Sequence, residues 1–132
     1  MKILTLVGSG EFTPAMLSTD SFLLEELKKN QPRMRITVAI IPTASGLSGH
    51  PKKWVADGKK HFQKLGVDSF GLYVVRRQHA AKSSILVKLK SSSIMYFSGG
   101  HPGYLHQTLK NTQMWNLIEV RYRKGRILVG CS

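Results

Sequence analysis

Two hydrophobic periods alternate along the chain. Short apolar runs rich in β-branched residues occupy residues 3–7, 36–41, 67–75, 94–97 and 127–129, and most of them lead directly into Gly, Pro or Ser. Runs of this length and composition are typical of buried strands. The pattern therefore predicts five strands.

The segments between these runs have helical spacing instead. Apolar side chains recur every three or four positions within residues 22–27, 54–65, 85–89 and 105–122, which predicts helical structure in each segment. Apolar strands that alternate with helices favour a parallel sheet with helices on both faces, because right-handed crossovers place the helices over the sheet. The expected fold is α/β: a flavodoxin-like three-layer sandwich with a mostly parallel sheet of about five strands, formed by residues 1–132 as a single domain.

In such sheets ligands bind at the carboxyl ends of the strands, so the loops that follow the strands are the first candidates for a site. The loop at residues 8–14 is rich in glycine but lacks the GK[ST] of a phosphate loop, which favours a simple glycine turn. Beside Gly10, its one acid, Glu11, is either a site residue or a solvated, turn-capping group. In the loop at residues 42–46, the Ser45 hydroxyl either faces a ligand or satisfies backbone groups.

The last two predicted strands end in sequences with more specific chemistry. After the fourth, Gly99 and Gly100 precede His101, and two glycines remove both Cβ atoms where the chain turns. Backbone N–H groups in such a turn can face the crevice and stabilise an oxyanion. After the fifth, a Gly-Cys-Ser that ends at Ser132 is the first half of a nucleophile elbow, which exposes a serine hydroxyl at the sheet edge. Consecutive strands are often neighbours, so we expect the two turns to lie side by side.

The charge of the chain opens a second hypothesis. Twenty Lys and Arg residues against seven Asp and Glu residues give a net charge of +13, enough to attract a polyanion or an anionic surface. The basic residues are spread along the sequence, so their side chains could either be distributed evenly over the solvated surface or gather on one face. The alternative function is accordingly a non-catalytic basic α/β module that binds nucleic acid or another polyanion, although no aromatic-basic RNA motif accompanies the charge.

The cysteine content and the lengths of the apolar runs bear on metal binding, cofactors and location in the cell. The single cysteine cannot form an internal disulfide, and no His or Cys residues have metal-ligand spacing, so we predict no metal site and no cofactor. No apolar run reaches the roughly 18 to 20 residues that span a bilayer, and the first residues lack the features of a signal peptide. These features predict a cytoplasmic protein without membrane contact.

Five sequences, in chain order, resemble the front part of peptidase family S51, which includes dipeptidase E and cyanophycinase relatives within the class I glutamine amidotransferase-like fold. They are VGSGEFTP, VAIIPTASG, HFQKLGV at residues 61–67, YFSGGHPGYL and ILVGCS, and together they extend the resemblance over essentially the whole chain. The resemblance implies a serine peptidase that attacks a peptide carbonyl, with acidic substrates in some relatives. It also implies that Ser132 is the nucleophile and that Gly99 and Gly100 belong to the loop that helps form the oxyanion hole.

The chain also departs from the family pattern. The Ala-Gly expected after the nucleophile, the later catalytic histidine and its acidic partner have no counterpart, and His101 stands where relatives often have Asn or Asp. We therefore expect little hydrolysis by these 132 residues alone. His101 is either a substitute base or a loop-capping residue. A natural fragment, one chain of a split enzyme and a designed minimal fold all fit the sequence, and a second copy or a complementing chain is expected to cover an exposed sheet edge.

Overall fold

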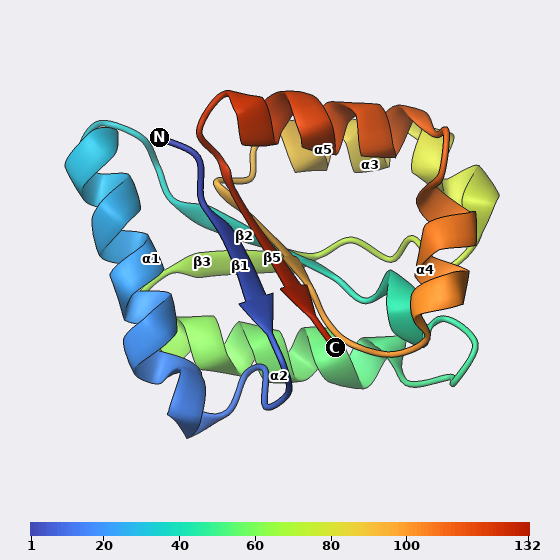
Figure 1. Cartoon of the computed structure of the whole chain (residues 1–132), viewed down its shortest axis with the longest axis horizontal. Helices are drawn as coiled ribbons and strands as arrows, with labels where there is room; N and C mark the ends of the chain where they lie inside the picture. The colour runs from blue at the N-terminus through green and yellow to red at the C-terminus, as the bar shows by residue number, and fades with distance from the viewer.

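The computed structural model describes all 132 residues, which form one five-stranded sheet with helices on both faces (Figure 1). The strands are β1 (Leu4–Val7), β2 (Thr37–Ile41), β3 (Asp68–Gly71), β4 (Ile94–Phe97) and β5 (Ile127–Cys131). The helices are α1 (Leu17–Asn30), α2 (Pro51–Lys64), α3 (Ser83–Lys90), α4 (Pro102–Leu109) and α5 (Gln113–Arg123), with short 3₁₀ helices η1 (Pro14–Met16), η2 (Thr43–Ser45) and η3 (Arg77–Ala81). The strand order is β1-β5-β4-β2-β3, and every neighbouring pair is parallel.

Each face of the sheet has its own apolar core. On one face, α1 and α2 pack against alternate strand residues through Leu23, Leu24, Leu27, Val55 and Phe62. On the other face, η3, α3, α4 and α5 cover the strand residues that point the opposite way. Figure 1 shows α3 and α5 on one side of the strands and α2 on the other. The predicted three-layer α/β sandwich is therefore confirmed.

Two predicted boundaries are wrong. The strand expected at 67–75 pairs only over Asp68–Gly71, because its neighbour β2 ends at Ile41 and leaves the following residues without a ladder partner. The helical segment expected at 105–122 is broken into α4 and α5. Asn111 adopts a left-handed φ of 56°, and the Thr112 hydroxyl then accepts the N–H of Trp115 at 3.1 Å as the N-cap of a new helix.

The strand order sets the position of the candidate site. Because β5 lies between β1 and β4, the chain segments that leave these three parallel strands emerge at the same edge of the sheet. Residues about 90 to 120 positions apart in sequence are brought together there. None of the helices combines the length and the hydropathy required to cross a bilayer.

Candidate active site

The turn after β4 and the end of β5 are in contact. The N–H of Ser132 donates to the carbonyl of Val7 at 2.9 Å, which continues the β1–β5 ladder up to the last residue. A Cβ added at Gly99 would overlap the carbonyl oxygen of Ser132, so the two turns touch through backbone atoms. The expected juxtaposition of Ser132 with the glycine turn is therefore present, and only glycine fits at position 99.

The glycine turn has one backbone N–H without an acceptor. The Gly99 N–H donates to Oε2 of Glu11 at 2.7 Å, and the His101 N–H donates to the carbonyl of Ala44 at 2.7 Å. Between them, the exposed Gly100 N–H donates to no protein group. A Cβ at Gly100 would overlap the Ala44 carbonyl, so glycine is required here as well. The turn thus presents the Gly100 N–H as a donor available to a ligand.

Glu11 lies inside the protein, and its interpretation as a solvated group is wrong. Only 7% of its surface is exposed. Gly10 adopts a left-handed φ of 87°, and Phe12 does so at 63°, which is unusual for a residue with a side chain. The resulting turn packs the Phe12 ring 4.9 Å from that of Tyr96, centroid to centroid, and leaves Glu11 directed at Gly99. The loop after β1 is therefore a glycine turn that positions the buried carboxylate of Glu11 against the turn after β4.

Ser45 satisfies the backbone of its own loop. It is 2% exposed, and its hydroxyl donates to the carbonyl of Pro42 at 2.9 Å. Of the two interpretations of this serine, the structure shows the one in which the hydroxyl serves the backbone. The loop contributes to the site through the neighbouring Ala44, whose carbonyl accepts the N–H of His101.

His101 caps helix α4. Its Nδ1 accepts the backbone N–H of Tyr104 at 2.9 Å, so that nitrogen carries no proton. In the neutral ring the proton then resides on Nε2, and neither nitrogen has a free lone pair to act as a general base. The structure shows the loop-capping role for His101, and this geometry leaves it unsuited to activate Ser132.

Comparison with known proteins bears on the family and the fold of the chain. Residues 4–132 match the sequence profile of peptidase family S51. The chain belongs to this family. It is 35% identical over 98 residues to an uncharacterized peptidase, Lin0382, of Listeria innocua, an alignment that covers 73% of this chain and 44% of the relative.

Solved structures of peptidases share the fold. A peptidase from an acI-B1 Actinobacterium superposes with a TM-score of 0.90 at 35% identity, over 98% of this chain and 53% of the other. A putative peptidase E protein from Listeria monocytogenes superposes with a TM-score of 0.69 at 30% identity, over 100% of this chain and 59% of the other. The chain thus spans about half the length of the relatives it matches.

Sequence reasoning missed a buried pair of polar side chains in this S51 chain. Oδ2 of Asp20 lies 2.6 Å from Nε2 of His61, and the two side chains are 1% and 2% exposed. The pair joins α1 to α2 beneath the loop after β1, where Phe12 packs 6.0 Å from His61, ring centroid to ring centroid. The sequence did contain a signal: Asp20 falls on the same helical stripe as Leu23, Leu24 and Leu27.

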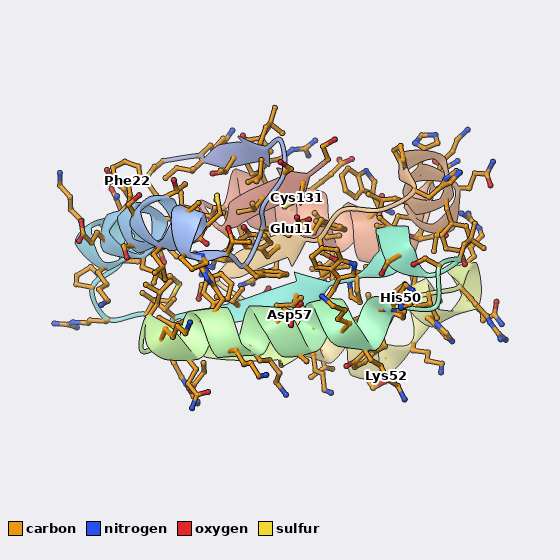
Figure 2. All side chains as sticks on the ribbon, turned by 90° about the horizontal axis from the view of Figure 1, so that it is seen from below. Glu11, Phe22, His50, Lys52, Asp57 and Cys131 are labelled. Carbon is orange, nitrogen blue, oxygen red and sulfur yellow. The ribbon has the colours of Figure 1, made fainter.

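Cys131, the residue before Ser132, is a neutral thiol. Burial raises the pKa of Cys131 to about 12, and the nearby Glu11 carboxylate adds to the effect. Figure 2 shows Glu11 and Cys131 next to one another in the middle of the molecule. Burial, followed by the charge of Asp20, likewise raises the pKa of Tyr96. A thiol with so high a pKa is a poor nucleophile at neutral pH, which leaves Ser132 as the candidate at the end of β5.

An apolar hollow opens beside Ser132 on the face that carries α4 and α5. Its volume is about 770 Å³. It is lined by side chains from β1, α4, α5 and β5, among them Leu6, Leu105, Trp115 and Leu128. The strand β1 is at the sheet edge, and Leu4 and Leu6 are 52% and 79% exposed. No helix of this chain covers that part of the sheet.

No group of three or more His, Cys, Asp or Glu side chains is arranged to hold a metal.

Proposed function

We propose that this chain carries the nucleophile side of a serine peptidase site. In this proposal the hydroxyl of Ser132 loses its proton to a general base and attacks the carbonyl carbon of a peptide, and the Gly100 N–H helps to stabilise the oxyanion that forms. The C–N bond then breaks, the amine leaves with the proton, and water hydrolyses the acyl-enzyme. The observation that carries the proposal is the contact between Ser132 and the Gly99–Gly100 turn at the carboxyl ends of β5 and β4. The net charge of +13 suits an acidic peptide as the substrate.

The 132 residues supply no evident general base for Ser132. No side chain of the chain is hydrogen-bonded to the Ser132 hydroxyl, and the nearby His101 is occupied as a helix cap. A positioned base contributes about 10² to 10⁴ to the rate. The 132 residues alone are therefore expected to hydrolyse peptides poorly.

We further propose that the apolar hollow is a docking site for a second polypeptide. We assign it to a polypeptide equivalent to the remainder of an S51 domain, since the matched structures contain about as many residues again. The hollow borders Ser132 and includes the exposed Leu4 and Leu6 of the edge strand, which an added helix or strand would cover. A polypeptide bound there would be well placed to bring a base to Ser132.

The test of the chemistry is complementation. The chain is mixed or co-expressed with the part of the acI-B1 peptidase that it does not match, and hydrolysis of dipeptides with an N-terminal Asp is followed. The complex is expected to hydrolyse them, and Ser132→Ala is expected to lower kcat at least ~10³-fold. The control is Ser9→Ala, which removes an exposed hydroxyl from the loop after β1. Equal activity of the two variants would refute Ser132 as the nucleophile.

The docking surface is tested separately with Leu6→Asp. Leu6 is 79% exposed, so the substitution leaves the folded chain stable but places a charge in the hollow. We expect binding of the complementing polypeptide, measured by calorimetry, to weaken at least ~10-fold. Leu47→Asp is the matched control, since Leu47 is 67% exposed in the loop before α2. Unchanged binding, or a dimer of the chain alone that Leu6→Asp dissociates, would overturn this assignment of the hollow.

The polyanion hypothesis receives less support from the charge distribution. Exposed basic residues occur on α1 and α2, over one face of the sheet, and on α3 and α5, over the other. In Figure 2, Lys52 extends from the outer side of α2. On the same helix, Asp57 pairs with Lys53 at 2.8 Å. No single face gathers the positive charge, so we retain the peptidase proposal.

A further inference from the structure

The buried carboxylate of Glu11 links two loops that are 88 residues apart in the sequence. It enters from the turn after β1 and accepts the Gly99 N–H at 2.7 Å. A Cβ at Gly99 would also come within 3.0 Å of the same oxygen, so the carboxylate and the turn are in close contact. A buried carboxylate is costly unless hydrogen bonds compensate it, and here the backbone of the candidate oxyanion loop supplies one.

Glu11 accepts one of the two hydrogen bonds that anchor the glycine turn. The Gly99 N–H is held by Glu11, and the His101 N–H is held by the carbonyl of Ala44 at 2.7 Å. The N–H of Gly100, between these anchors, has no acceptor within the protein. Two glycines in succession would otherwise leave the chain free to rotate, because they lack the Cβ atoms that restrict φ and ψ. The two flanking hydrogen bonds restrict that rotation.

We infer that Glu11 is a positioning residue that holds the glycine turn in the conformation that keeps the Gly100 N–H available beside Ser132. This inference rests on the proposed function, which gives that N–H its role in stabilising the oxyanion. The useful feature of Glu11 is its acceptor oxygen and not its charge, because a negative charge near the site would oppose a developing oxyanion. Glutamine at this position should therefore preserve the effect, whereas alanine should abolish it.

Amide hydrogen exchange of the ¹⁵N-labelled chain tests the positioning. In Glu11→Ala the exchange of the Gly99 N–H is expected to accelerate about 10- to 100-fold, the range that a lost hydrogen bond to a charged acceptor implies. Glu11→Gln is expected to restore most of the protection, and the Gly100 resonance should shift only in the alanine variant. Glu25→Ala, which removes an exposed acid on α1, is the control for a change of charge alone.

Urea unfolding of each variant separates local opening from global loss of stability. Gly99 protection that is equal in Glu11→Ala and Glu25→Ala would overturn the inference, as would a glutamine variant that behaves like alanine.

Hydrolysis by the complemented chain provides the catalytic readout. Loss of an aligned oxyanion donor typically lowers kcat by about 10² to 10³, so Glu11→Ala should lower kcat in that range with little change in KM, and Glu11→Gln should remain near the unsubstituted chain. A kcat unaffected by Glu11→Ala would overturn the catalytic role even if Gly99 loses its protection. Retained activity of Ser132→Ala would instead refute the proposed function. Amide exchange of Gly99 tests the role of Glu11 whether or not the chain is a peptidase.

Discussion

Asp20→Ala is expected to lower the free energy of unfolding by about 3 kcal/mol, because it leaves the buried His61 without its partner. The two side chains are almost wholly inaccessible and 2.6 Å apart, and they connect the two helices that pack on one face of the sheet. Urea unfolding monitored by circular dichroism measures the change directly.

The chain supplies a control of the same residue type for this substitution. Asp57 pairs with Lys53 at 2.8 Å on α2, but these side chains are 38% and 68% exposed. Exposed pairs of this kind contribute less than about 1 kcal/mol, so Asp57→Ala should have a small effect. A loss for Asp20→Ala no greater than that for Asp57→Ala would show that the buried pair does not stabilise the fold.

Gly99→Ala is expected to lower the free energy of unfolding by about 2 to 3 kcal/mol and to separate the two turns of the site. The added methyl group would overlap the carbonyl oxygen of Ser132 and approach Oε2 of Glu11 within 3.0 Å. The first obstacle is a main-chain atom of Ser132, whose N–H is hydrogen-bonded to the carbonyl of Val7, so relief of the overlap would shift Ser132. Displacement of Ser132 by about 1 Å would also lower hydrolysis by the complemented chain by about 10²-fold.

Gly130→Ala is the matched control for this second substitution. Gly130 lies in β5 next to Phe97 of β4, yet nothing lies within 4 Å of the Cβ that it would gain. Its substitution should change stability by less than about 0.5 kcal/mol, the usual limit for a change that meets no obstacle. If the two variants unfold at the same urea concentration, the close approach of Gly99 to Ser132 is not a constraint on the fold.

The hydrophobic periodicity of the sequence was sufficient to predict the α/β architecture, because each strand and helix has its own local pattern of apolar residues. All five strands were predicted, and β4 at Ile94–Phe97 was predicted to the residue, since a fully apolar run flanked by polar serines has clear ends. The errors occurred where pairing or capping decided the boundary. The strand β3 is limited by the length of β2, and the break between α4 and α5 depends on the left-handed Asn111 and the Thr112 cap.

The candidate site was less accessible to sequence reasoning. Ser132 and the Gly99–Gly100 turn were found because glycine and serine at strand ends have a recognisable chemistry. Glu11 is the one acid in the loop at residues 8–14, but its burial and its hydrogen bond to Gly99 depend on the strand order. His61 falls within the predicted helical segment at residues 54–65, and nothing in its own neighbourhood in the sequence indicates that it meets Asp20.

The sequence by itself determined the α/β class, the parallel sheet, the family resemblance and the two turns that carry the candidate chemistry. These properties depend on local patterns that survive in the unfolded chain. Only the tertiary structure decided that Glu11 anchors the glycine turn, that His101 caps a helix, and that an apolar hollow borders Ser132. The physical reason is that these features arise from the order β1-β5-β4, which joins residues distant in the chain, and hydrophobic periodicity does not encode which strands become neighbours.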